Sequence, residues 1–341
     1  RSTSSAASDV YKRQLLALLT WQIKEPPRGL SEGLISSESK NPLKETFKEL
    51  VGLTPFGLVG SDNFKKELSI NIIFTVLIFL ASYYLYVLTG DFLQWTAFGI
   101  GVYVICNWIH GLKNRDPVAF LLIFKSKALL LGLLSFPFIT FVTYALGAFG
   151  PSFYIRNFSM TATEVGIIYG LITVFGSMIG VICGGILGDK LRETYVNGKL
   201  YLIMASAVLT GVTAIGFIHS ENLVASFTWK FVYHIASTAW LGCAASTVTE
   251  LVLPRLRAVA SAFFILMLSM IGLALGPYLT GMVSDIYINS GLLPGPALKN
   301  AMTLTLVVLV LPFGLLAVAC KYLKNDEAEI YEKSRSRGEE S

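Results

Sequence analysis

An uncharged run from Val165 to Gly188 constrains this chain more than any other stretch. The run is 24 residues long, and about 20 apolar residues are enough for an α-helix to cross the hydrocarbon core of a bilayer. Within it, Gly176, Gly180, Gly184 and Gly188 recur at every fourth position, so they share one face of the helix. Small residues on one face let a second helix approach closely. The sequence therefore predicts a membrane-spanning helix that packs tightly against another helix.

Composition places the whole chain in the same class. The 341 residues are 54% hydrophobic and 14% charged, and the mean hydropathy is +0.63, which is typical of a polytopic membrane protein. The net charge of +5 does not indicate nucleic-acid binding, because the basic residues are spread over loops. We expect no disulfide, metal site or cofactor, because the cysteines lie in apolar stretches without CxxC spacing and are predicted to be buried thiols: Cys106, Cys183, Cys243 and Cys320.

Further apolar stretches predict an all-α polytopic bundle. The first two are joined by the tight turn Gly90-Asp91 and are expected to form a membrane hairpin. All but three of the 27 lysines and arginines then fall on one side of the membrane, the exceptions being Arg156, Lys230 and Lys299. Because basic loops stay in the cytoplasm, this asymmetry orients the chain. The predicted spans besides 165–188 are residues 68–89, 92–112, 128–155, 200–218, 227–252, 254–285 and 301–320.

The end of the uncharged run carries a family motif. Gly185-x-Leu187-Gly188-Asp189-Lys190 resembles the G-x-L-[AG]-D-[RK] motif of the major facilitator superfamily, found in the loops between helices 2 and 3 and between helices 8 and 9. Where that pattern continues with glycine and two basic residues, this chain reads Leu191-Arg192-Glu193. The resemblance implies a gating or structural role for Gly185, Gly188, Asp189 and Lys190. We expect Asp189 to pair with Arg257 or with a helix N-terminus.

Three other stretches carry the same resemblance. Gly276-Pro277-x-x-Thr280-Gly281-x-x-Ser284-Asp285 is similar to the end of helix 11 in the superfamily, which implies a structural role for Gly276, Pro277 and Gly281. Lys24-Glu25-Pro26-Pro27-Arg28-Gly29 resembles the start of the central cytoplasmic loop in Spinster-like members. Residues 145–156 resemble the outer end of helix 7 in the same group.

The resemblance covers about residues 15–60 and 128–322 and leaves the hairpin unmatched. It implies a C-terminal six-helix half with an inserted hairpin and a remnant of helix 6, whose partner would be the missing N-terminal half of the same protein. The first residues lack a methionine and an apolar signal core, so we interpret them as non-native. The predicted divisions are 1–14 (non-native), 15–23 (helix remnant), 24–67 (cytoplasmic central loop), 68–112 (inserted hairpin), 128–322 (six-helix half) and 323–341 (charged, solvated cytoplasmic tail).

One predicted span, 227–252, is unusually polar. Lys230 and His234 are four residues apart and share a helix face. An ionisable residue at membrane depth is a functional hypothesis in itself. We predict that both line a substrate cavity with Tyr144, whose hydroxyl follows those of Thr140 and Thr143 just after a break expected at Pro137. The alternatives are that Lys230 reaches the outer headgroups and that His234 is packed between helices.

These patterns favour a secondary transporter that works by alternating access in a bacterial inner membrane. No G-x-x-x-x-G-K-[ST] sequence occurs, so ion coupling is expected. The resemblance implies a small amphiphilic or anionic solute, such as a lipid-like molecule. A polytopic membrane enzyme such as a lipid acyltransferase and a non-transporting sensor are the alternatives. The dispersed histidines (His110, His219 and His234) argue against the enzyme. Without its other half, two surfaces are expected to lie against lipid. They are the polar stripe of Lys230, His234 and Ser237 and the glycine face of Gly176, Gly180 and Gly184.

Overall fold

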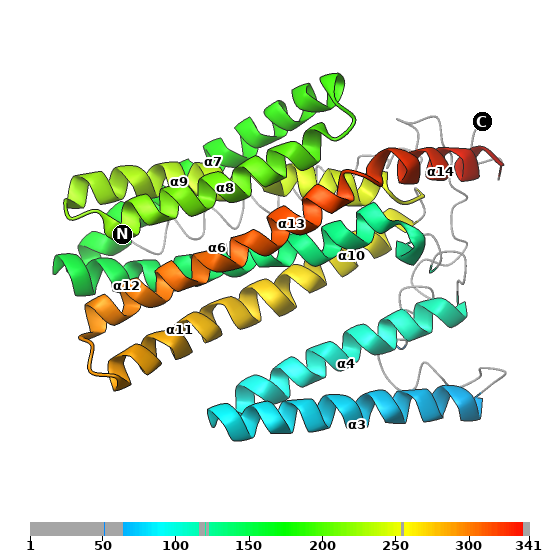
Figure 1. Cartoon of the computed structure of the whole chain (residues 1–341), viewed down its shortest axis with the longest axis horizontal. Helices are drawn as coiled ribbons and strands as arrows, with labels where there is room; N and C mark the ends of the chain where they lie inside the picture. Colours follow the sequence, from blue (N-terminus) through cyan, green and yellow to red (C-terminus); the bar gives the residue numbers. More distant parts are fainter. Residues whose placement is uncertain (1–50, 52–63, 116–119, 121–122, 254–255, 337–341) are drawn as a thin grey trace, which may run out of the picture.

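The computed structural model of the chain describes residues 51, 64–115, 120, 123–253 and 256–336. The interpretations of residues 1–14 and 15–23 and of most of the central loop therefore lie outside the described residues. Seven helices in the described part are long and apolar enough to cross a membrane. The chain is an integral, multi-pass membrane protein with an all-helical architecture (Figure 1).

The hairpin consists of α3 (Phe64–Thr89) and α4 (Phe92–Arg115). Its turn contains Gly90 at a φ of +81°, a conformation that glycine adopts without the steric cost of a side chain. The two helices coincide with the predicted spans 68–89 and 92–112. In Figure 1 the hairpin lies along one side of the remaining bundle.

The bundle itself is formed by six long helical segments. One of them, α9, is not among the seven apolar helices, because its polar residues lower its hydropathy, yet it runs beside α7 and α8 over most of their length (Figure 1). We therefore treat it as an eighth crossing helix. The segments are α6 (Lys127–Phe158), α7 (Ala162–Thr194), α8 (Gly198–His219), α9 (Leu223–Glu250), α10–η4–α11 (Arg257–Met267, Leu268–Leu273, Ala274–Asn289) and α12–η5–α13 (Pro294–Thr305, Leu306–Leu309, Val310–Ala319).

The most buried span of the bundle is α6. It contributes to two hydrophobic clusters, which we call inner (toward the predicted cytoplasmic side) and outer (toward the opposite side). In the inner cluster Phe136 stacks on Trp240 at 6.0 Å between ring centroids, and the outer cluster surrounds Tyr154. The helix continues through Pro137, where the sequence predicts a kink. Thr140 donates its hydroxyl hydrogen to the Pro137 carbonyl at 2.8 Å.

The predicted exit of the first span is also corrected. Helix α7 does not stop at Gly188 but runs on to Thr194, and the turn follows at residues 195–197. The Gly185–Lys190 motif therefore lies within the last turns of a helix rather than in a loop. The residues after Gly188 include leucine, arginine and glutamate, which are good helix formers. A capping box between Thr161 and Glu164 fixes the other end of the helix.

The charged tail is helical instead of a merely solvated end. Helix α14 (Leu323–Ser336) begins with Leu323 buried in the inner cluster. Asp326 accepts hydrogen bonds from the Ser126 hydroxyl and the Ala128 amide, both at 2.8 Å. Glu327 pairs with Arg192 at 2.6 Å. Carboxylates of α14 therefore satisfy the first turn of α6 and bind the end of α7.

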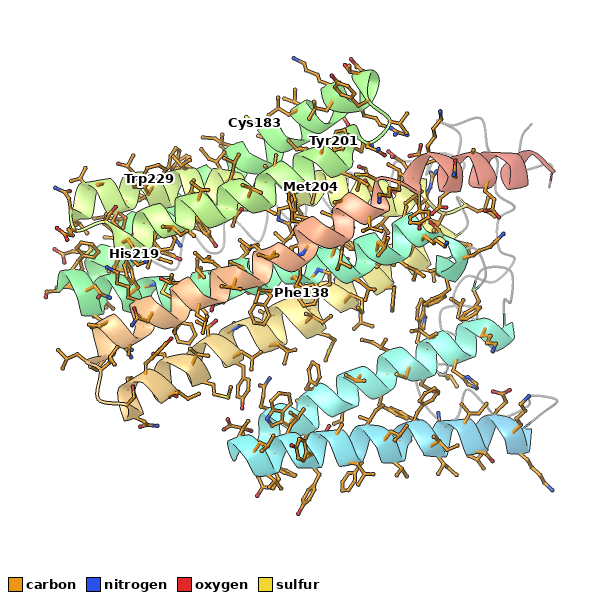
Figure 2. The ribbon with its side chains drawn as sticks, in the orientation of Figure 1. Phe138, Cys183, Tyr201, Met204, His219 and Trp229 are labelled. Carbon is orange, nitrogen blue, oxygen red and sulfur yellow. The ribbon has the colours of Figure 1, made fainter. Side chains whose placement is uncertain are left out.

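The prediction that all cysteines are buried is wrong for Cys183. All four thiols are free, but only Cys243 is buried, whereas Cys183 is exposed on the surface of α7 (Figure 2). In a membrane protein an apolar stretch can face lipid as easily as a core. Apolar surroundings in the sequence therefore do not predict burial of a thiol here.

Candidate functional site

The glycine face of α7 packs directly against α9, which confirms the predicted close helix contact. Side-chain atoms built on Gly180 and Gly184 would overlap the carbonyl oxygens of Ile235 and Ala239, and one built on Gly176 would lie 2.7 Å from the Cβ of His234. The expectation that this face lies against lipid is wrong, because α9 of the same chain covers it. Close backbone approach of this kind maximises van der Waals contact between membrane helices.

Lys230 of α9 is enclosed near this contact. Its side chain is 0% exposed. The Nζ atom lies over three aromatic rings, 5.0 Å from the centroid of Tyr169, 4.2 Å from that of Phe217 and 4.4 Å from that of Tyr233. We call these three rings the Lys230 cage. They come from α7, α8 and α9, so the amine lies where three helices meet. In this conformation Lys230 does not reach outer headgroups.

The cage leaves the buried polar atoms without conventional partners. Neither Lys230 Nζ nor the Tyr233 hydroxyl has a hydrogen-bond partner in the described part of the chain. A ring face attracts a cation by about 0.5–2 kcal/mol, while removing an unpaired charge from water costs several kcal/mol. The cage therefore compensates the burial of a charged amine only in part. Such an arrangement lowers stability, and buried ionisable groups of this kind are characteristic of functional sites.

The side chain of His234 faces α7 rather than the Nζ atom of Lys230. Its Nε2 lies 3.0 Å from the Thr173 hydroxyl, and its ring meets Tyr169 edge-on at 6.0 Å. His234 is therefore packed between two helices, the alternative left open by the sequence. Tyr169 and Tyr233 each contact both His234 and Lys230, so these two residues share two aromatic neighbours.

Tyr144 is not part of this cluster. It lies on α6 and is 43% exposed, whereas none of the three cage rings comes from α6. The hydroxyls of Thr140 and Thr143 donate to carbonyls of their own helix. The structure therefore brings Lys230 and His234 together but leaves Tyr144 on a separate, accessible face.

The remaining histidines have partners of their own outside this cluster. His110 pairs with Glu67 in the hairpin, and His219 Nε2 lies 3.1 Å from the Thr303 hydroxyl near the outer end of α8 (Figure 2). Trp229, also near the outer ends, packs over Gly216 of α8. The histidines thus contact different partners in different helix pairs.

The inner ends of the helices hold the residues of the predicted gating motif. Asp189 and Lys190 are exposed, and Asp189 has no ion-pair partner among the described residues. Arg257 Nε donates to the Thr249 carbonyl at 3.1 Å. The predicted Asp189–Arg257 pair is therefore absent from this conformation, and a pair between Lys199 and Glu250 lies nearby on α8 and α9.

The second motif packs against α6. A side-chain carbon on Gly276 would overlap the carbonyl of Phe141, and one on Gly281 would lie 3.0 Å from the ring of Phe149. Pro277 lies inside α11, and the wide π-helical turn η4 precedes it. The glycines therefore allow this helix to lie close to α6, as the structural role implied by the motif requires.

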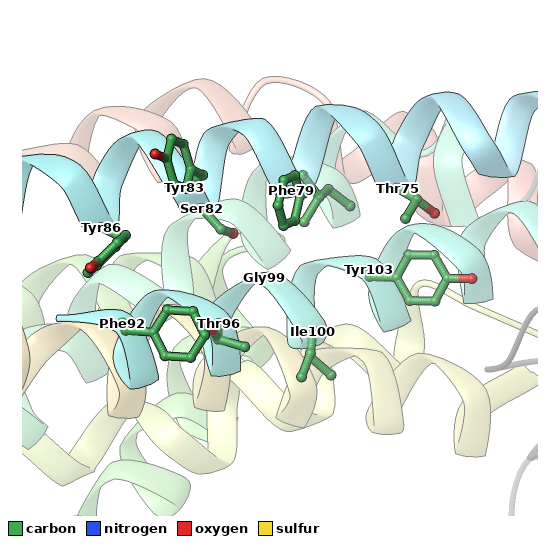
Figure 3. A pocket seen from close by; sticks show the side chains of 11 residues that line it. Thr75, Phe79, Ser82, Tyr83, Tyr86, Phe92, Thr96, Gly99, Ile100 and Tyr103 are labelled. Atoms are coloured by element: carbon green, nitrogen blue, oxygen red, sulfur yellow. The ribbon is translucent and has the colours of Figure 1, made fainter.

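A groove of about 290 Å³ lies elsewhere, between α3 and α4 of the hairpin (Figure 3). Aromatic side chains line it, including Phe79, Tyr83, Tyr86 and Tyr103. None of the predicted cavity residues takes part. The described residues thus hold an enclosed polar cluster in the bundle and an open apolar groove in the hairpin.

No family model matches the chain. It is similar to an MFS-type efflux pump of Mycolicibacterium smegmatis, with 30% identity over 187 residues, or 54% of this chain and 42% of that protein. It is 26% identical to protein spinster of Drosophila melanogaster over 173 residues, or 47% of this chain and 28% of that protein. The chain is homologous to Spinster-like transporters of the major facilitator superfamily. It spans less than half the length of these curated relatives.

A solved structure supports the same assignment of the fold. It is of a bacterial homologue of the human lysosomal transporter Spinster in an inward-facing and unoccupied conformation, at 21% identity and a TM-score of 0.56. The match covers 69% of this chain and 59% of that chain. At this identity the likeness shows the fold alone, which is the helix bundle of the major facilitator superfamily.

Two residues of the cage, Tyr169 and Phe217, were missed by sequence reasoning. Tyr233 is signalled by its position three residues after Lys230, because residues at that spacing share a helix face. Tyr169 and Phe217 belong to other helices, and nothing in their local sequence marks them. Their role follows only from the packing of α7 and α8 around α9.

Proposed function

We propose that the chain is the C-terminal half of an ion-coupled secondary transporter that moves a small amphiphilic or anionic solute. Homology to Spinster-like transporters and the major facilitator fold support alternating access about a central site. In this proposal a second six-helix half of the same protein faces the bundle, and the membrane is a bacterial inner membrane. Neither half would transport alone, because the path runs between them.

The observation that carries the proposal is the enclosure of Lys230 in its cage. A lysine without hydrogen-bond partners inside a membrane bundle reduces stability, and such residues are retained at substrate or ion pathways. We propose that the cage opens in another conformation and presents the amine to the anionic group of the solute. His234 would follow on the same helix, and the exposed Tyr144 would contact the apolar part of the solute from α6.

Transport by reconstituted protein tests this proposal. The chain and a version extended by its upstream sequence are placed in liposomes, and uptake of a fluorescent lysophosphatidic acid is followed with and without a proton or sodium gradient. The extended protein should show saturable uptake that depends on one gradient, while the chain alone should show none. Uptake that ignores both gradients would contradict ion coupling, and saturable uptake by the chain alone would contradict the two-half proposal.

Substitution of Lys230 tests its role in the same assay. Lys230→Met keeps a side chain of similar length without the amine, so uptake should fall at least tenfold. Lys190→Met removes an exposed lysine and is the matched control, which should retain uptake. Equal uptake by the two variants would remove Lys230 from the transport path.

A further inference from the structure

The long helix α10–η4–α11 is irregular over a short segment. In η4 the chain makes a π-helical turn at Leu268–Leu273, and the Ala274 amide donates to the Ser269 carbonyl five residues back. Pro277 follows within α11 and has no amide hydrogen for the carbonyl four residues earlier. π-Turns and prolines are the usual sites of helix bending. We call residues 268–277 the hinge segment.

The hairpin touches the hinge segment through α4. The side-chain amide of Gln94 donates to the Ala274 carbonyl at 3.2 Å, at the junction of η4 and α11. Met270, within η4, lies against Gly101, where a side-chain carbon would overlap the methionine side chain. A helix outside the six-helix half therefore contacts both the π-turn and the backbone just before the proline.

Further contacts hold α4 at both ends of the hinge segment. The Tyr278 hydroxyl donates to Asp91 at 2.7 Å, and the Tyr278 ring meets Trp95 edge-on at 5.4 Å between centroids. At the other end Trp108 stacks on Phe263 at 5.1 Å with 16° between the ring planes. Because both ends are fixed, α4 lies along the irregular part of the helix, as Figure 1 shows.

We infer that the hairpin braces the hinge segment and limits the bending of α10–η4–α11. The hydrogen bonds from Gln94 to the Ala274 carbonyl and from Tyr278 to Asp91 must break when the helix bends away from α4. The effect of the brace on transport rests on the proposed function, in which this helix moves during alternating access. The brace itself is a property of the bundle and can be measured without transport.

Hydrogen–deuterium exchange of the full chain in nanodiscs tests the brace. Gln94→Met removes the amide donor, and Tyr278→Phe removes the hydroxyl but keeps the ring. Each should speed exchange of amides in residues 268–278 by about threefold to tenfold, the range expected for one hydrogen bond. Tyr83→Phe removes a hydroxyl from the exposed side of α3 and is the matched control, which should leave this exchange unchanged.

A reversible crosslink gives the opposite perturbation. Met270 Cγ lies 3.7 Å from the place of a Cβ on residue 101, so Gly101→Cys with Met270→Cys brings two thiols within reach of each other. Oxidation should slow exchange in residues 268–278 at least tenfold, and reduction should restore it. Unchanged exchange in Gln94→Met and Tyr278→Phe, or equal acceleration by Tyr83→Phe, would overturn the brace. Altered exchange in the chain, together with no uptake by the version extended by its upstream sequence, would uphold the brace and contradict the proposed function.

Discussion

Helices α3 and α9 reverse the usual relation between hydropathy and burial. In α3 the most apolar stretch contains no buried residue. Helix α9 is too polar to count as a candidate span, yet it is packed between α7 and α8 and buries Lys230, His234 and Ser237. Lipid tails are as apolar as leucine, so exposing an apolar helix to them costs little, whereas a polar helix needs protein partners.

The two helices therefore differ in what holds them. Helix α9 is held by close backbone contact with the glycines of α7 and by side-chain bonds such as that from Ser206 to the Ala236 carbonyl at 2.5 Å. Between helix α3 and its neighbour α4 lies a polar seam, where Asn71 donates to Asn107 at 2.8 Å and Tyr103 donates to Asn71 at 3.0 Å. This contrast predicts large effects of substitution around α9 and small ones in the hairpin.

The largest effect is expected at the α7–α9 contact. Gly184→Ala inserts a methyl group into the carbonyl of Ala239, so the helices must separate and the free energy of unfolding should fall by about 3 kcal/mol. Gly185→Ala is the matched control one residue away, because nothing lies within 4 Å of its added carbon. It should be neutral or stabilise by up to about 1 kcal/mol. Unfolding in mixed detergent micelles measures both.

A glycine in the hairpin sharpens the same comparison. Gly99→Ala meets only the side chain of Ser82, which can rotate away, so its cost should be below about 1 kcal/mol. Equal losses at Gly184 and Gly99 would show that the hairpin is packed as tightly as α9, and the contrast between the two regions would fail.

Much of the fold follows from local sequence patterns. The spans, the Gly90 turn and the close-packing face of α7 were all predictable, because apolar length, glycine conformation and four-residue spacing are local properties. The length of α7 and the helix α14 were not. Both depend on partners distant in sequence, such as Arg192 with Glu327, whose pairing no periodicity reveals.

Of the candidate site, only the residues on α9 were predictable from the sequence. The four-residue spacing of Lys230 and His234 correctly placed both on one helix face. Both were predicted to line a cavity, with contact of Lys230 with the headgroups and packing of His234 between helices as the alternatives. The structure encloses Lys230 with rings from α7, α8 and α9, because the bundle supplies its own cover for this residue. Tyr144 was grouped with them by its position after Pro137, and the unbroken α6 does not bring it to the cage.

The next largest effect concerns the buried amine of α9. Lys230→Met should raise the free energy of unfolding by about 2 kcal/mol, because an apolar chain of similar size replaces an amine without a hydrogen-bond partner. The stability gain should accompany the loss of uptake proposed above. Lys190→Met, at an exposed site, should change stability by less than about 0.5 kcal/mol. A loss of stability in Lys230→Met would mean that the cage stabilises the ammonium by more than its burial costs.

A smaller effect is expected in the polar seam of the hairpin. Asn107→Leu removes the acceptor of the Asn71 amide and should weaken the contact of α3 with α4 by about 0.6 kcal/mol, the average for hydrogen bonds between membrane helices. Because the other contacts of the bundle are untouched, a disulfide-trapping assay between α3 and α4 should report the change while global unfolding does not. A change in global unfolding above about 2 kcal/mol would show that the seam supports the bundle as a whole.

The smallest effect is expected at Asp189. The carboxylate is exposed at the inner end of α7 and has no ion-pair partner among the described residues, so Asp189→Asn should change the free energy of unfolding by about 0.5 kcal/mol or less. Glu327→Gln is the comparison, because it breaks the partly buried pair with Arg192 and should cost more, about 1 kcal/mol. Both variants neutralise one carboxylate near the same helix end, so net charge cannot explain a difference between them. If Asp189→Asn lowered the free energy of unfolding more than Glu327→Gln, Asp189 would form an ion pair or hydrogen bond in a conformation other than this one. That result would support the gating role implied by the motif.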